Sequence, residues 1–195
     1  QGRQEQRVHL LHRRRLGAPS AALAYFEEAL SADPGLRKAQ EAVALALDDE
    51  ELKVRAAEVL SPLYENDGNW TELVRVMRVR LDAMTDTAAE FALRARVADV
   101  LENKLRDLPS AFAMVARMVE IDPLHRDARA TLARLAETRN AEPERAQVLE
   151  SVISRVNDVA ERRALLTELA ELWSERVGDS ARAESAYERL LAVAG

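Results

Sequence analysis

Residues 93–107, LRARVADVLENKLRD, return in altered form 72 positions later as residues 165–179, LLTELAELWSERVGD. In both stretches a large apolar residue precedes an Ala, and another large apolar residue follows three positions after it, which is a helical spacing. The same offset of 72 also aligns Leu60 with Leu132. Half of it is 36, which is the length of one two-helix unit. A unit of that size buries its apolar face against its neighbours, so the pattern predicts a repeat array rather than a closed bundle.

Turn residues divide the chain into segments of about 13–19 residues whose apolar side chains recur at helical spacing. Proline marks many of the boundaries, because it lacks the N–H that a helix interior needs. Pro19, Pro109 and Pro143 lie at the beginnings of segments. Pro34 and Pro123 follow segment ends. Pro62 lies inside a segment and should kink it near Glu58. We therefore expect an all-α fold of about eleven antiparallel helices without strands, forming one solenoid domain over residues 1–195.

The composition excludes several classes of protein. The 195 residues carry 28 Lys and Arg against 34 Asp and Glu, a net charge of −6, and 48% of them are hydrophobic, as in a globular protein. The sequence has no Cys, which excludes disulfides, Cys-ligated zinc and a thiol nucleophile. No apolar run reaches the roughly 20 residues of a membrane helix, so we expect no membrane insertion.

The first residues carry no targeting information. The chain begins at Gln1 with neither an initiator Met nor a signal-peptide core, so we expect a fragment of a longer protein. Its location stays unknown, and a soluble, cytoplasmic protein is the favoured interpretation.

Glu5 aligns with Glu161 at an offset of 156, but Arg15 aligns with Arg176 at 161, so the first segment is 5 residues short. We expect residues to be missing after His12, because arginines at a helix crossing would bury unpaired charge.

The residues between 17 and 34 resemble a tetratricopeptide repeat. They have that family's turn glycine, small residue, aromatic residue, alanine and closing proline, which are Gly17, Ala22, Phe26, Ala29 and Pro34. The last unit repeats the pattern with Gly178, Ala183, Tyr187, Leu190 and Gly195. First helices should carry a small residue that lets two backbones approach closely, here Ser61, Ala98, Ala133 and Ala170. The resemblance implies a right-handed α-α superhelical solenoid. The sequence as a whole is similar to the degenerate repeat arrays of large bacterial proteins.

The sequence departs from the family pattern at several positions. Arg106 and Asn140 stand where the turn glycine is expected, and Arg145 occupies a small-residue position beside Ala146. Residues 35–47 and 50–65 follow each other without a clear second-type helix between them. The pairing of helices is therefore hardest to predict in that part of the chain.

The resemblance implies a non-catalytic scaffold for protein–protein interactions, with a peptide or protein partner bound on the concave face formed by first helices. In this family the contacts come from polar positions around the small residue and late in the first helix. Carried over to this sequence, they are Asp99, Glu102, Asn103, Arg134, Glu137, Glu171, Ser174 and Glu175. Five of them are acidic and one is Arg, so we expect a basic or mixed-charge partner. The competing interpretation is a face that is simply solvated.

Two other classes of function stay open. The chain could be a structural spacer or a self-assembling array, with self-association through the exposed apolar faces of its terminal helices. It could also be a regulatory domain of an enzyme that lies outside this sequence. The neighbouring parts of a full-length chain would distinguish these functions.

Metal and nucleic-acid sites are not expected. His9 and His12 lie three residues apart but have no third ligand near them in the sequence, whereas metal sites need three or four. Arg13, Arg14 and Arg15 make residues 1–16 basic, with five Arg against one Glu. The acidic remainder of the chain opposes a polyanion, and no aromatic residues alternate with these arginines to stack on bases.

Catalysis is not expected either. We find no Ser/His/Asp set, no paired carboxylates in a predicted cleft and no glycine-rich phosphate loop, so the sequence predicts no enzyme and no cofactor. Trp70 and Trp173 are the only tryptophans, and we expect both to be packing residues rather than anchors for a partner.

Overall fold

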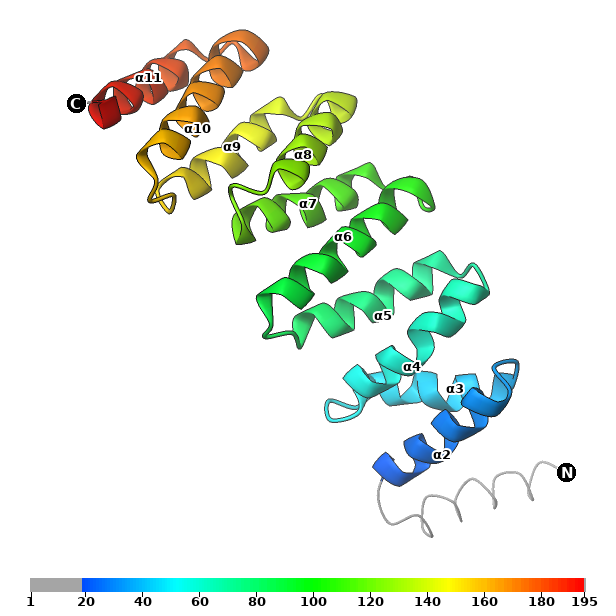
Figure 1. The fold of residues 1–195 in the computed structure, drawn as a ribbon. Coiled ribbons are helices and arrows are strands. Elements are labelled where there is room, and N and C mark those ends of the chain that lie inside the picture. Colours follow the sequence, from blue (N-terminus) through cyan, green and yellow to red (C-terminus); the bar gives the residue numbers. More distant parts are fainter. Residues whose placement is uncertain (1–18, 195) are drawn as a thin grey trace, which may run out of the picture. The chain divides into compact units, whose positions relative to one another are not determined.

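The computed structural model describes residues 19–194, and this part of the chain is built from helices without any strand. Contacts within the chain divide it into two compact units on either side of the boundary between Thr85 and Asp86, of which the structure describes residues 19–85 and 86–194. Figure 1 labels the helices in chain order. The ten α-helices in the described range agree with the expected all-α repeat fold. The single domain expected over residues 1–195 stays a prediction.

In the first unit, the described residues from 19 onward form four α-helices and one short 3-10 turn. They are α2 (Pro19–Ala32), α3 (Arg37–Leu45), η1 (Ala46–Asp48), α4 (Lys53–Asn66) and α5 (Trp70–Asp82). Helix α3 packs on α2 and α4, and α4 packs on α5. As expected, α3 and α4 follow each other with only η1 between them. Helix α4 continues through Pro62, which is exposed, and the hydroxyl of the buried Ser61 donates a hydrogen bond to the Ala57 carbonyl at 2.6 Å.

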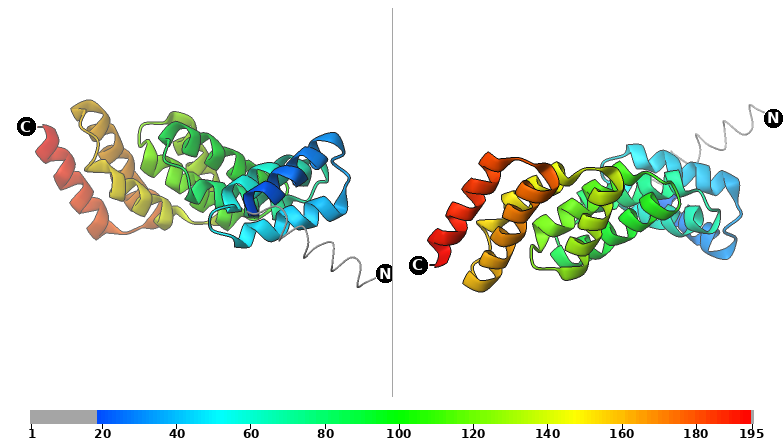
Figure 2. Two further views of the ribbon diagram at one scale, coloured as in Figure 1. Left: turned by 90° about the horizontal axis from the view of Figure 1, so that it is seen from below. Right: turned by 90° about the horizontal axis from the view of Figure 1, so that it is seen from above.

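The second unit contains three helix pairs that follow one another along the chain (Figure 2). Its elements are α6 (Thr87–Asn103), α7 (Leu108–Ile121), α8 (Arg126–Arg139), α9 (Glu142–Ile153), α10 (Val159–Glu171), η2 (Leu172–Val177) and α11 (Ser180–Ala194). Element η2 is a π-helical turn that extends α10. Helix α7 packs on α6, α8 and α9, so each pair is buried against the next.

Aspartate side chains begin most helices of the second unit. Asp86, Asp107, Asp158 and Asp179 each accept a hydrogen bond from the backbone N–H three residues later, at distances of 2.6–3.1 Å. These bonds satisfy N–H groups that have no partner within the helix. In α8 the imidazole Nδ1 of His125 takes this role toward Ala128 at 3.3 Å.

One turn in each helix pair contains a residue with left-handed backbone conformation. These residues are Gly68, Arg106, Asn140 and Gly178, with φ values of 68°, 57°, 53° and 78°. The offset of 72 found in the sequence places Gly68 on Asn140 and Arg106 on Gly178. Arg106 and Asn140 therefore replace the expected glycine without changing the backbone conformation. Arginine pays a steric penalty in this region because of its Cβ.

The small residues of the first helices are mostly buried, as predicted. Ser61 is 6% exposed, Ala98 7% and Ala170 0%. Ala133 is half-buried, and the buried face of α8 is centred on Leu132, Leu135 and Ala136. In α9 the buried small residue is Ala146, beside Arg145.

Several predictions concern residues 1–18, which lie outside the described residues. They are the histidine pair at His9 and His12, the basic run Arg13 to Arg15, and the residues expected to be missing after His12. They stay predictions.

The buried position of Ala170 gives a stability test. We expect Ala170→Leu to lower the free energy of unfolding by about 1–3 kcal/mol, because the larger side chain overpacks the core between α9, α10 and α11. Ala164→Leu is the matched control, since Ala164 is an exposed residue of the same helix. Urea denaturation followed by circular dichroism measures both. Equal stability of the two variants would contradict the register of α10.

The turn residues give a second test. Gly178→Ala should destabilise the chain by about 1 kcal/mol, because a Cβ is strained at positive φ. No atom lies within 4 Å of the added Cβ, so the loss reports backbone strain rather than a clash. Arg106→Gly should shift stability in the opposite direction. A Gly178→Ala variant that unfolds like the wild type would exclude a strained left-handed residue at this turn.

Candidate functional site

The eight predicted contact residues all lie in the second unit, on its successive first helices. Helix α6 carries Asp99, Glu102 and Asn103, α8 carries Arg134 and Glu137, α10 carries Glu171, and η2 carries Ser174 and Glu175. We call these eight residues the first-helix wall. All of them are exposed except Glu102, which is half-buried.

Ion pairs between helices connect the members of the wall. The guanidinium of Arg134 holds both carboxylate oxygens of Glu102, with Nη2 at 2.9 Å from Oε2. Arg176 of η2 lies 4.0 Å from Glu137. On α6 itself, the Asn103 amide donates to Asp99 at 2.7 Å. These contacts link α6 to α8 and α8 to η2, the latter through Arg176, which lies next to the wall residue Glu175.

These contacts make the wall less acidic than the number of its Asp and Glu residues suggested. The hydrogen bond from Arg134 lowers the pKa of Glu102 against the opposing effect of desolvation, and the charges of Arg134 and Arg106 lower it further. The same hydrogen bond raises the pKa of Arg134. Within the described range, the wall carboxylates without an ion pair are Asp99, Glu171 and Glu175.

Sequence reasoning missed a half-buried cluster of ion pairs between α8, α9 and α10. Glu168 of α10 accepts hydrogen bonds from Arg129 of α8 and from Arg145 of α9, the latter at 2.5 Å. All three side chains are at most 26% exposed, and the Nε of Arg129 is buried without a hydrogen-bond partner. The cluster explains how Arg145 fits at a small-residue position, because its guanidinium reaches out of the helix crossing to Glu168.

A regular charge spacing could have revealed these pairs. Arg129 and Glu168 lie 39 residues apart, as do Glu150 and Arg189, which pair at 3.1 Å between α9 and α11. The Glu137–Arg176 contact has the same spacing. Opposite charges at this distance therefore mark successive repeats.

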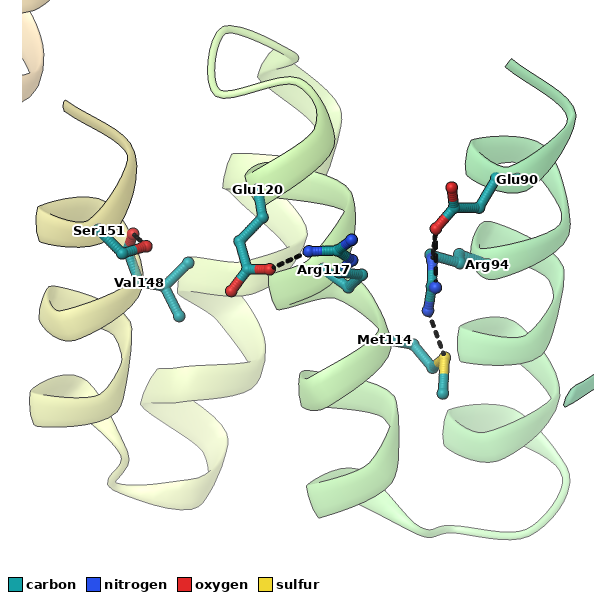
Figure 3. A network of polar contacts seen from close by, with 7 residues as sticks. All are labelled: Glu90, Arg94, Met114, Arg117, Glu120, Val148 and Ser151. Atoms are coloured by element: carbon teal, nitrogen blue, oxygen red, sulfur yellow. Dashed lines mark hydrogen bonds and ion pairs between the residues drawn. The ribbon is translucent and has the colours of Figure 1, made fainter. Parts of the chain in front are cut away.

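Figure 3 shows two arginines of α6 and α7 that are paired with close neighbours. Arg94 pairs with Glu90 at 2.8 Å and donates a hydrogen bond to the Met114 sulfur at 3.8 Å. Arg117 pairs with Glu120 at 2.8 Å, a bond that raises the pKa of Arg117. These local pairs leave no concentration of charge comparable to the wall.

The two tryptophans differ in burial. Trp173 is 1% exposed, as predicted for a core residue, and the Arg182 guanidinium lies 4.6 Å above its ring. Trp70 is half-buried and covers the turn at Gly68, where a Cβ would lie 3.9 Å from the indole nitrogen.

The described residues offer little for other chemistry. Between residues 19 and 194, no group of three or more His, Asp or Glu is placed to hold a metal ion. A hollow of about 400 Å³ lies between the α7–α8 and α9–α10 loops. Its Asp122 and Asp158 already accept hydrogen bonds from backbone N–H groups. None of the helices in this range combines the length and apolarity needed to cross a bilayer.

The Glu102–Arg134 pair gives a pH-dependent prediction. Near neutral pH, Glu102→Gln should lower the free energy of unfolding by about 0.2–1 kcal/mol. The folded-state pKa of Glu102 lies below that of the unfolded chain. The stabilisation is therefore complete above about pH 4.3 and is lost as the pH falls through the lowered value. Urea denaturation at several pH values measures it. Glu171→Gln is the control, and an equal pH dependence for both variants would contradict the prediction.

Comparisons with known proteins give a limited result. No protein-family model matches the chain, and no curated protein matches it either. A structure of the TPR-like repeats named after a kinesin light chain of Podosopora anserina is 16% identical, with 90% of this chain and 96% of that chain covered and a TM-score of 0.38. A structure of the MamA protein is 12% identical, with 91% and 93% covered and a TM-score of 0.44.

At these sequence identities and TM-scores, the similarity to solved structures supports no conclusion about function. The assignment of the fold rests on the chain itself, on its successive helix pairs, its left-handed turn residues and its buried small residues. By these features the described part of the chain is an all-helical repeat array of successive helix pairs.

Proposed function

We propose that this chain is a non-catalytic protein–protein interaction scaffold whose partner binds on the first-helix wall. The observation that carries the proposal is the continuity of the wall. Polar residues from α6, α8 and η2 are linked across the helices by Glu102–Arg134 and Glu137–Arg176. An extended peptide or a protein edge can contact several successive helices on such a surface.

The charges of the wall favour a partner with basic residues. Asp99, Glu171 and Glu175 are exposed carboxylates without a paired cation in the described range. Lys or Arg side chains of a partner would supply that cation. Exposed ion pairs contribute little to folding, so Glu102 and Arg134 can exchange partners at small cost and accept a mixed-charge segment. Such complementarity speeds encounter and selects partners more than it adds affinity.

Neither nucleic acid nor an enzymatic substrate suits this surface. The net charge is −6, which repels a polyanion. The wall has neither aromatic side chains for base stacking nor a nucleophile paired with a base. A partner protein or peptide remains the ligand that fits these residues.

The proposal is tested with a synthetic array of peptides that differ in net charge. We expect basic peptides to bind the wild-type chain, with affinity falling as salt rises. The double variant Glu171→Lys/Glu175→Lys should bind them about tenfold more weakly. Its matched control is Glu41→Lys/Glu58→Lys, which makes the same charge change at exposed positions of the first unit.

Two outcomes would contradict the proposal. In one, both double variants lose binding equally, which would reflect the overall charge of the chain rather than the wall. In the other, acidic or neutral peptides bind best. Circular dichroism of each variant establishes that the helices are intact.

A further inference from the structure

The α7–α8 and α9–α10 loops border a hollow on the edge of the second unit that faces away from the first-helix wall. The hollow has a volume of about 400 Å³ and lies where α7 and α9, which pack on each other, both end. Figure 1 shows the two loops at one edge of this unit, whereas the turns after α6, α8 and η2, which follow the wall residues, lie at the opposite edge. A cavity of this size is large enough to receive a small ligand or a long side chain of a partner.

Apolar side chains form one side of the hollow. Val156 is 5% exposed and Ile121 is half-buried, whereas Leu124 is 38% exposed. The positions 36 residues before and after Leu124 are Ala88 and Ala160, so the repeat pattern does not require a large side chain there. A partner that covers Leu124 removes apolar surface from water, and this burial stabilises a complex.

Two aspartates supply unused hydrogen-bond acceptors in the lining. Asp122 accepts a hydrogen bond from the Leu124 N–H at 3.1 Å, and Asp158 accepts one from the Glu161 N–H at 2.9 Å. Each of these bonds is made to the Oδ1 atom, and no donor in the described range is bonded to the Oδ2 atom of either aspartate. The hollow therefore offers one free carboxylate oxygen from each of two loops.

The helix ends around the hollow favour a cation as the donor. Helices α7 and α9 both end at its border, and the C-terminus of a helix carries a partial negative charge. The N-termini of α8 and α10 reach the same edge of the unit. Their partial positive charge is already met, because His125 accepts a first-turn N–H of α8 and Asp158 accepts one of α10.

The remaining charged residues of the lining leave an excess of negative charge. Glu120 is paired with Arg117 at 2.8 Å, so it adds little to the field in the hollow. Among the described residues, Arg155 is the one cation that lines the hollow, and its exposed guanidinium has no ion-pair partner in that range. The carboxylates of Asp122 and Asp158 outnumber it by one charge.

We infer that the hollow between the α7–α8 and α9–α10 loops binds an arginine side chain of a partner protein together with the aliphatic residue beside it. The guanidinium has donors on several nitrogens in a fixed plane, so it can bond to the Oδ2 atoms of Asp122 and Asp158 at the same time. Its methylene stem and the aliphatic neighbour pack on Leu124 and Val156, since long cationic side chains bury their stems on apolar surface. The inference does not rest on the first-helix wall, because no wall residue lines the hollow.

The inference is tested by NMR titration of the isotope-labelled 195-residue chain with the end-blocked tripeptide Leu-Arg-Leu. We expect the backbone amide resonances of Leu124 and Asn157 to shift saturably, since both residues line the hollow. The tripeptides Leu-Gln-Leu and Leu-Glu-Leu should bind there about tenfold more weakly or not at all. Shifts of Glu171 and Glu175 report on the first-helix wall and are fitted separately, so that each proposal can fail without the other.

Aspartate-to-asparagine variants test the role of charge. Asp122→Asn/Asp158→Asn should weaken binding of Leu-Arg-Leu at the hollow about tenfold. An asparagine still accepts the turn hydrogen bond, so the loops keep their conformation. The matched control is Asp49→Asn/Asp86→Asn, which makes the same charge change outside the hollow. Asp49 accepts an N–H two residues later, like Asp122, and Asp86 accepts one three residues later, like Asp158.

Two further variants test the sign of the ligand charge and the apolar contact. Arg155→Ala should strengthen binding of Leu-Arg-Leu severalfold, because it removes a like charge from the lining. Leu124→Ala should weaken binding severalfold. Its matched control is Leu36→Ala, at a residue of the first unit that is 42% exposed, and this variant should bind like the wild type.

Three results would overturn the inference. The first is a wild-type chain in which the resonances of Leu124 and Asn157 do not respond to Leu-Arg-Leu. The second is an equal loss of binding in the two double variants, which would reflect the overall charge of the chain. The third is weaker binding of Leu-Arg-Leu, or tighter binding of Leu-Glu-Leu than of Leu-Arg-Leu, when Arg155 is compared with Arg155→Ala, which would assign the hollow to an anion. Melting curves of all variants exclude unfolding as the cause.

Discussion

Leu165 and Leu169 of α10 and Trp173 of η2 are buried only because α9 and α11 lie against these two elements. This mutual burial of apolar stripes is the constraint on which the second unit depends, since one amphipathic helix cannot remove its stripe from water alone. Ala146, Ala170 and Ala183 make the arrangement possible, because their small side chains let neighbouring backbones approach. At α11 the same requirement leaves Tyr187 and Leu191 without a covering helix in the described chain.

At the turns, successive repeats have the same left-handed backbone conformation although the residue that adopts it differs between them. Gly68 and Gly178 adopt positive φ at little steric cost, and Asn140 tolerates it. Arg106 adopts the same conformation although its side chain disfavours it, because α6 and α7 fix the chain on both sides. Its charge also lowers the pKa of Glu102, so this turn connects the backbone geometry to the first-helix wall.

Ion pairs between repeats alter the surface more than they alter the stability. Glu102–Arg134 and Glu150–Arg189 are largely exposed, and such pairs contribute little to the free energy of unfolding. They nevertheless decide which carboxylates a partner can meet. Glu102 is already neutralised, whereas Glu171 and Glu175 remain available. The half-buried cluster at Glu168 joins α8, α9 and α10 through two ion pairs.

The sequence by itself determined the helical class, the helix boundaries at Pro109 and Pro143, and the burial of Ala98 and Ala170. These features are local or periodic, so they can be recognised without knowing which helices are neighbours. Only the tertiary structure decided that Ala133 is half-buried whereas Ala136 is fully buried, and that Arg134 neutralises Glu102. Both depend on the rotation of one helix against another, which the packing of many side chains sets and no single stretch of sequence encodes.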